Sequence, residues 1–202
     1  FSPDGTKVAS GSWDNTVKVW DVMSGECIQT LDGHFSTTDR RFSGVFCVSF
    51  SPDGEKVASG TWAMYRRGEV KVWDIESGVC LQTLEGHSSV VNSVSFFPDG
   101  KKIASGDASG AVKVWDVASG KCLQTLSGHS DQVHSVAISS DGSKVASGSS
   151  DKTMKIWEDV RARKQKEMHL LMLSVKRAQT PAGNNKRDLS LIHISEPTRP
   201  TP

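Results

Sequence analysis

Apolar and polar residues alternate in short runs along most of the chain, and glycine-containing turns separate these runs. The runs "CLQTL", "VHSVAIS", "KVASGS" and "TMKIW" follow one another between residues 122 and 157. Alternation with period two, β-branched residues and Asp-Gly or Ser-Gly turns between the runs are typical of short antiparallel strands. The pattern predicts units of four strands, each unit forming one small antiparallel sheet.

The same unit recurs along the chain. The sequence "VKVWD" stands at 17–21, 70–74 and 112–116 and returns as "MKIWE" at 154–158, so that four tryptophans are spaced 53, 42 and 42 residues apart. A Gly-His dipeptide also recurs at His34, His87 and His129. A fixed period of this length indicates a repeat architecture. The fold class that it predicts is all-β.

The longer first interval contains eleven extra residues. Alignment with the other repeats places seven of them in "FSTTDRRFSGVF" (35–46) and four in "WAMYRRG" (62–68). Loops absorb insertions at a small thermodynamic cost. We therefore expect both insertions in loops of the second unit.

Four strands per 42 residues, with Gly-His before the first strand and Trp-Asp ending the third, resemble the WD-repeat β-propeller family. The resemblance covers residues 1–158. It implies a β-propeller fragment of about four blades, in which the first blade lacks its inner strand and the last its outer strand. Since the chain opens on Phe1 inside a repeat, we expect a fragment whose ring is closed by further blades of the parent chain.

The resemblance also implies a tetrad of Trp, Ser or Thr, His and Asp that locks each blade. The indole only donates hydrogen bonds, the carboxylate only accepts, and serine and neutral histidine do both, so the four groups satisfy one another. Because the set recurs, a structural role is favoured over a catalytic Ser-His-Asp triad. The residues assigned to these tetrads are Ser10, Asp14 and Trp20; His34, Ser59 and Trp73; His87, Ser105 and Trp115; and His129, Ser147, Asp151 and Trp157.

Two blades depart from this tetrad at the position of the acid. Arg67 stands there in the second blade and Ser109 in the third. We therefore expect these two blades to be less tightly locked.

Two tryptophans lie outside the repeated pattern. Trp13 and Trp62 occupy equivalent places before the turn between the second and third strands, where the other blades have Ala108 and Ser150. No packing rule demands an aromatic residue there, and exposed aromatic residues beside arginine are typical of binding surfaces. The hypothesis is a partner-binding patch, against the alternative that each tryptophan packs over its own turn. Its residues are Trp13, Trp62, Tyr65, Arg66 and Arg67.

Composition excludes several classes of function. The 24 basic and 23 acidic residues leave the chain near neutrality, which does not indicate a strongly basic nucleic-acid-binding protein. A long apolar run and a signal peptide are both lacking, so a soluble, non-secreted protein without a membrane partner is expected. Phosphate-binding, zinc-protease and hydrolase motifs are lacking too, so we expect no catalytic residues, no metal and no cofactor.

The four cysteines indicate a reduced compartment. Cys27, Cys80 and Cys122 start the outer strand in successive units, and Cys47 aligns with serine in the later repeats. Equivalent positions on neighbouring sheets favour packing over pairing, and no CxxC spacing offers a metal site. A cytoplasmic or nuclear setting is expected.

The chain changes character after residue 158. Residues 159–188 form a basic tail that is either helical over 160–177 or non-native read-through, with two basic pairs that faintly resemble a nuclear signal. Residues 189–202 include "LSLIHISEPTR", which resembles the translation of a transposase sequencing adapter and is expected to be a disordered artefact outside the functional chain.

These observations predict a non-catalytic protein–protein interaction scaffold. Two alternatives remain open from the resemblance: a ligand-recognition propeller of a larger signalling NTPase, or the receptor subunit of a ubiquitin ligase. A third alternative is RNA binding through the basic tail.

Overall fold

A computed structural model of the chain describes residues 1–34, 43–63, 67–158 and Met172. The chain divides into two compact units, Phe1–Arg163 and Lys164–Pro202. Met172, an exposed helical residue, is the described part of the second unit. The expectations for the basic tail and for residues 189–202 therefore lie outside the described residues.

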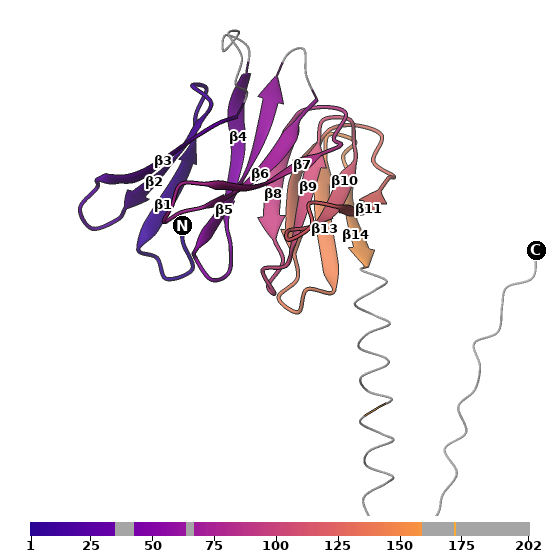
Figure 1. The fold of residues 1–202 in the computed structure, drawn as a ribbon. Helices are drawn as coiled ribbons and strands as arrows, with labels where there is room; N and C mark the ends of the chain where they lie inside the picture. The colour runs from indigo at the N-terminus through magenta and orange to yellow at the C-terminus, as the bar shows by residue number, and fades with distance from the viewer. Residues whose placement is uncertain (35–42, 64–66, 159–171, 173–202) are drawn as a thin grey trace, which may run out of the picture. The chain divides into compact units, whose positions relative to one another are not determined.

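The first unit consists of four antiparallel sheets with three, four, four and three strands (Figure 1). The first sheet contains β1 (Lys7–Gly11), β2 (Thr16–Asp21) and β3 (Cys27–Asp32). The second contains β4 (Ser43–Phe50), β5 (Lys56–Ala63), β6 (Glu69–Asp74) and β7 (Cys80–Glu85). The third contains β8 (Val91–Phe96), β9 (Lys102–Asp107), β10 (Val112–Asp116) and β11 (Cys122–Leu126). The fourth contains β12 (Val133–Ile138), β13 (Lys144–Ser149) and β14 (Met154–Glu158).

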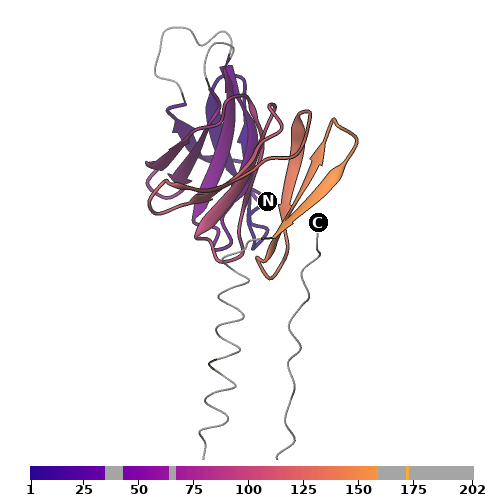
Figure 2. The same ribbon diagram turned by 90° about the vertical axis from the view of Figure 1, so that its right-hand side faces the viewer.

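Each sheet is a meander whose strands pair in chain order, as the repeat predicts. The inner strands β4, β8 and β12 contact one another in turn, and β1 contacts β4 where the first sheet has no inner strand. The sheets therefore stand side by side as successive blades (Figures 1 and 2). The prediction of an all-β propeller fragment of about four blades is confirmed.

The hydrophobic core lies between the blades. Val17, Val19 and Leu31 of the first blade pack against Val57 and Trp73 of the second. The same set of valine, leucine and tryptophan positions packs the second blade against the third and the third against the fourth. Because one face of each sheet is covered by a neighbouring blade, a single blade cannot bury its apolar residues alone.

A glycine in the second strand allows this close approach. A Cβ on Gly106 would lie 2.5 Å from a methyl carbon of Val133, and one on Gly11 would lie 2.5 Å from a methyl carbon of Val45. Real Cβ atoms do not approach that closely, so the repeated Ser-Gly dipeptide is required by the neighbouring blade. At Gly148 in the last blade, no atom of the described residues lies within 4 Å of such a Cβ.

Candidate protein-interaction site

In three blades, a tetrad of side chains links the loop before the blade to its second and third strands. In the fourth blade, the Trp157 indole nitrogen donates to Ser147 Oγ at 2.8 Å, and this hydroxyl lies 2.8 Å from Nε2 of His129. Nδ1 of His129 lies 2.7 Å from a carboxylate oxygen of Asp151. A neutral imidazole that accepts from the serine and donates to the carboxylate satisfies every group.

The third blade contains an equally complete network with the acid at a different position. Trp115 donates to Ser105 Oγ at 2.7 Å, Nε2 of His87 lies 2.6 Å from the same oxygen, and Nδ1 of His87 lies 2.9 Å from Asp107. Asp107 stands two residues before Ser109, and it accepts hydrogen bonds from the Ser109 backbone and hydroxyl. The expectation of a loosened third blade was therefore wrong, because an acid on the strand end reaches the same histidine nitrogen.

The second blade uses an acid from the other side of the turn. Trp73 donates to Ser59 Oγ at 2.8 Å, and Nε2 of His34 lies 2.5 Å from this oxygen. Nδ1 of His34 lies 3.1 Å from Glu69, which stands two residues after Arg67. The longer glutamate side chain spans the extra distance, so the expectation of a loosened second blade is also corrected. Arg67 is exposed.

The electrostatics of these networks follow from burial and hydrogen bonding. Burial disfavours ionisation of Asp107, but hydrogen bonds from His87 and Ser109 outweigh it and lower the pKa of this carboxyl from 3.8 to about 2. Burial lowers the pKa of His34 below its ordinary value of 6.5, although the hydrogen bond to Glu69 opposes this. These interactions therefore hold Asp107 ionised and His34 neutral.

The tetrads are not arranged for catalysis. The side chains of Ser59 and Ser105 are 0% exposed, and Ser147 is 1% exposed. Each of these hydroxyls is engaged by an indole and an imidazole at once, so a substrate cannot reach it as it would a nucleophile.

In the first blade, Trp20 donates to Ser10 Oγ at 2.9 Å, while Asp14 accepts from the backbone and hydroxyl of Thr16.

The structure brings Trp13 and Trp62 together across the boundary between the first two blades. Their ring centroids are 5.5 Å apart with an interplanar angle of 74°, an edge-to-face arrangement. Phe46 joins them, with its ring centroid 5.3 Å from that of Trp13 and 6.2 Å from that of Trp62. We call Trp13, Phe46 and Trp62 the aromatic cluster.

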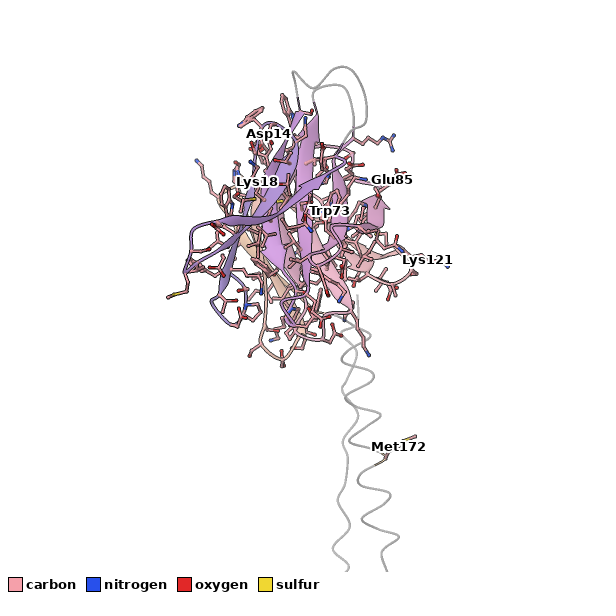
Figure 3. All side chains as sticks on the ribbon, turned by 60° about the vertical axis from the view of Figure 1, so that its left-hand side comes forward. Asp14, Lys18, Trp73, Glu85, Lys121 and Met172 are labelled. Atoms are coloured by element: carbon pink, nitrogen blue, oxygen red, sulfur yellow. The ribbon has the colours of Figure 1, made fainter. Side chains whose placement is uncertain are left out.

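Three separate elements position the aromatic cluster. Trp13 lies in the turn after β1, and the Val45 backbone nitrogen donates to the Ser12 carbonyl at 2.9 Å, which ties this turn to β4. Trp62 lies on β5, opposite Gly44 of β4, and the missing side chain of Gly44 leaves room for the ring of Trp13. Figure 3 labels Asp14, which follows Trp13 in this turn, and the buried Trp73.

Phe46 lies at a β-bulge. The pairing of β4 with β5 shifts register between Val45 and Cys47, so the residue between them has no partner on β5. A bulge re-aims a side chain, and Phe46 is 46% exposed while Trp13 is 65% exposed. The cluster is therefore an accessible apolar surface on a rigid scaffold.

Sequence reasoning missed Phe46, although a signal was present. The same register shift recurs before Ser93 in β8 and before Ser135 in β12, which makes Asn92 and His134 the equivalents of Phe46. An aromatic residue at a bulge position that is polar in the other blades marks it as a candidate. The repeat alignment alone places Phe46 in the inserted segment 35–46.

The equivalent places in the later blades are polar and engaged within the chain. Nδ2 of Asn92 donates to the Val133 carbonyl at 2.9 Å, and Nε2 of His134 lies 2.6 Å from Ser150 Oγ. The aromatic surface is therefore confined to the first two blades. Of the predicted patch, Tyr65 and Arg66 lie outside the described residues.

Two buried polar side chains lie beside the cluster in the sequence. Asn15, two residues after Trp13, is 1% exposed, and Ser43, next to Gly44, is 4% exposed. Their side-chain polar atoms have no hydrogen-bond partner among the residues that the structure describes. Asn15 also has a φ of 70°, a backbone conformation that asparagine tolerates better than most residues.

Over the described ranges, no group of three or more His, Cys, Asp or Glu side chains is placed to hold a metal ion, and none of the helices there has the length and apolar character to cross a bilayer. The four cysteines are free, and burial raises the pKa of the Cys47 thiol to about 12.

Antiparallel sheets of three or four strands packed face to face, three of them closed by a Trp-Ser-His-acid network, define a β-propeller protein. The family model "WD domain, G-beta repeat" matches residues 1–21, 25–74, 78–116 and 120–158. The chain belongs to the WD-repeat family.

Several curated proteins are similar to part of the chain. It is 30% identical over 102 residues to mitochondrial division protein 1 of Eremothecium gossypii, and 38% identical over 97 residues to F-box/WD repeat-containing protein sel-10 of Caenorhabditis elegans. Each match covers 46% of this chain and 14% of the relative. Cell division control protein 4 of Saccharomyces cerevisiae is 30% identical over 102 residues, covering 45% of this chain and 13% of that protein. The chain thus spans about one seventh of the length of these relatives.

Proposed function

We propose that the chain is a non-catalytic platform that binds a protein partner through the aromatic cluster. The observation that carries this proposal is the contact between Trp13, Phe46 and Trp62 on two adjoining blades, with Trp13 65% and Phe46 46% exposed. Water contact with this much aromatic surface is unfavourable, and tryptophan is enriched among the residues that dominate binding energy.

Rigidity supports the same proposal. The cluster stands on β4, on β5 and on a turn bonded to β4, so its rings are held in place before a partner arrives. A preorganised surface binds more tightly because less conformational entropy is lost on association. The exposed Arg67 adds a positive charge to the end of the same hairpin, and Tyr65 and Arg66 remain part of the proposed patch.

The test is selection of binding peptides from a displayed random library on the immobilised full chain. We expect the selected peptides to lose about thirtyfold in affinity for Trp13→Ala and for Phe46→Ala, because a hot-spot aromatic residue contributes about 2 kcal/mol or more. Urea unfolding of each variant checks that the fold is retained. Ile28→Ala serves as the matched control, since Ile28 is an apolar residue on β3 that is 48% exposed but lies outside the cluster.

Two results would contradict the proposal. The first is full affinity of the selected peptides for both aromatic variants, which would place binding elsewhere. The second is an equal loss for Ile28→Ala, which would indicate nonspecific adhesion to exposed apolar residues.

A receptor role in a ubiquitin ligase is the second candidate function. Its support is the 38% identity to a protein whose name includes an F-box beside its WD repeats. Under this candidate the blades would read the protein to be modified. Sequencing the parent gene tests it, because an F-box segment in the same reading frame is expected, and an NTPase domain there would favour the signalling-sensor alternative instead.

The proposed setting is the cytoplasm or the nucleus. The free cysteines at positions 27, 47, 80 and 122 support a reduced compartment. RNA binding through the basic tail concerns residues outside the described ranges.

A further inference from the structure

The three rings of the aromatic cluster are steeply inclined to one another. The interplanar angle is 67° between Trp13 and Phe46, 74° between Trp13 and Trp62, and 60° between Phe46 and Trp62. A flat ligand ring stacks on one of these faces at a time, whereas a rounded group contacts all three. The shape of the cluster therefore favours a compact ligand group.

The spacing of the rings brings all three within reach of a single charge. Their centroids are 5.3, 5.5 and 6.2 Å apart. A point about 5 Å from each centroid lies above the triangle that the centroids form, inside the limit of about 6 Å for attraction between a cation and a ring face. Since Trp13 is mostly exposed, a face of its ring meets water as well as its edge. One cation can therefore interact with three rings at once.

The nearby charges leave the choice of ligand to the rings. Ring faces are electronegative, and tryptophan attracts cations more strongly than the other aromatic residues. Among the described residues that flank the cluster in the sequence, Asp14 is held ionised, because hydrogen bonds from the hydroxyl and backbone of Thr16 lower the pKa of its carboxyl. Arg67 is exposed and carries the opposite charge. These two charges offset each other.

Blade closure does not require aromatic rings at these places. At the next two blade boundaries, the places of Phe46 and Trp62 are held by Asn92 with Ala108 and by His134 with Ser150. Both of those blades nonetheless have complete tetrads. Exposed rings that the fold does not use point to a ligand.

We propose that the aromatic cluster binds the trimethylammonium group of a trimethylated lysine side chain in a partner protein. This inference rests on the proposed function and names the chemistry that the same surface recognises. Trimethylammonium is rounded and cationic, and without an N–H donor it is less strongly hydrated than the ammonium of unmodified lysine. It therefore exchanges water for the three ring faces at a small cost, and the cation–π attraction favours it over a neutral group of the same shape.

The probes are two short alanine and glycine peptides that differ in one atom. One carries a trimethylated lysine at its centre, and the other carries the neutral analogue in which carbon replaces the charged nitrogen. Fluorine NMR of the full chain labelled with 5-fluorotryptophan measures binding of each peptide. We expect the charged peptide to bind about tenfold more tightly than the neutral one, and to shift the signals of Trp13 and Trp62 while that of Trp20 stays unchanged.

Matched variants separate the rings from simple charge attraction. Phe46→Asn, which copies the residue of the third blade, should weaken binding of the charged peptide about fivefold and reduce its advantage over the neutral one. Asp14→Asn keeps an acceptor for Thr16 but removes the charge, and it should weaken binding less than about twofold, because an exposed charge is screened by salt. Ile28→Ala, outside the cluster, should leave binding unchanged.

Four outcomes would overturn the proposal. The first is absence of binding by the charged peptide, and the second is equal binding of the charged and neutral peptides. The third is loss of the preference in Asp14→Asn but not in Phe46→Asn, which would assign recognition to the carboxylate. The fourth is tighter binding of free phosphocholine than of the charged peptide, which would assign the surface to a lipid headgroup.

Failure of this inference is distinguishable from failure of the proposed function. If the charged and neutral peptides bind alike while the library-selected peptides still lose affinity for Trp13→Ala, the cluster is a protein-binding surface without a preference for cations. If the selected peptides also keep full affinity for Trp13→Ala and Phe46→Ala, both proposals are rejected.

Discussion

At the scale of single residues, one serine hydroxyl holds each complete tetrad together. Ser105 Oγ accepts from Trp115 and lies within hydrogen-bond distance of His87, and all three side chains are 0% exposed. Ser10 in the first blade accepts from Trp20 at an exposed position, and no histidine of the described residues reaches it. The two serines therefore form a matched pair that differs in burial.

The change Ser105→Ala should lower the free energy of unfolding by about 2–4 kcal/mol, because two buried polar groups lose their partner. The change Ser10→Ala should lower it by about 0–1 kcal/mol, because water replaces the hydroxyl there. Urea unfolding followed by tryptophan fluorescence measures both. Equal effects of the two changes would show that burial of the network does not decide its contribution.

The pH dependence of stability is also set by single residues. His34 has a lowered pKa in the folded chain, so the unfolded chain takes up a proton that the folded chain does not as the pH falls below 6.5. Asp107 adds a second loss as the pH falls from 3.8 towards 2, where its folded carboxylate resists protonation. Both groups make the protein less stable in acid.

We therefore expect the urea midpoint to fall between pH 7.5 and pH 5, and to fall less steeply in the His34→Gln variant. His134→Gln is the control, since His134 is exposed on β12. The slopes, rather than the absolute midpoints, are compared because both substitutions also change stability at neutral pH. The same slope in His34→Gln and in the wild-type chain would contradict this account.

Residue positions also show where sequence reasoning reached its limit. The Trp, Ser and His positions could be assigned from the 42-residue period, because each repeats at a fixed spacing. The acids of the second and third blades could not, because Asp107 and Glu69 stand two residues to either side of the aligned position and reach His87 and His34 only in three dimensions. A fixed alignment does not represent side-chain length or the path of a turn.

At the scale of elements, the Ser-Gly dipeptide of the second strand sets how closely the next blade approaches. Gly106 faces Val133 of the following blade, whereas Gly148 faces open space in the described part of the chain. Gly106 and Gly148 therefore occupy the same strand position, and only Gly106 has a neighbouring blade against it among the described residues.

The change Gly106→Ala should destabilise the protein by about 1–3 kcal/mol, because the added methyl group overpacks the blade interface. The change Gly148→Ala should be neutral or stabilise the protein by up to about 1 kcal/mol, because it restricts the unfolded chain without a clash. Chemical unfolding of the two variants measures the difference. A destabilisation by Gly148→Ala as large as that by Gly106→Ala would show that the last blade is covered.

The strand pattern itself could be predicted from the sequence, but the bulge could not. Alternating apolar residues and glycine turns specify the strands, while the register shift beside Cys47 depends on how β4 fits between β5 and the neighbouring blade. Phe46 owes its exposure to that shift. The most informative member of the aromatic cluster was therefore the one that periodicity did not reveal.

At the scale of the whole molecule, the blades of the first unit form a scaffold that carries the aromatic cluster at the boundary of the first and second blades. Stability in such stacks is a sum of blade and interface contributions. A ligand at the aromatic cluster should therefore leave the distant blades unchanged.

The most direct test of the central claim is hydroxyl-radical footprinting of the full chain with and without a peptide selected on it. The account predicts that oxidation of Trp13, Phe46 and Trp62 falls on binding, while oxidation of Trp20, outside the cluster, is unchanged. Protection of other residues with the cluster still fully oxidised would contradict the assignment of the partner site to these three rings.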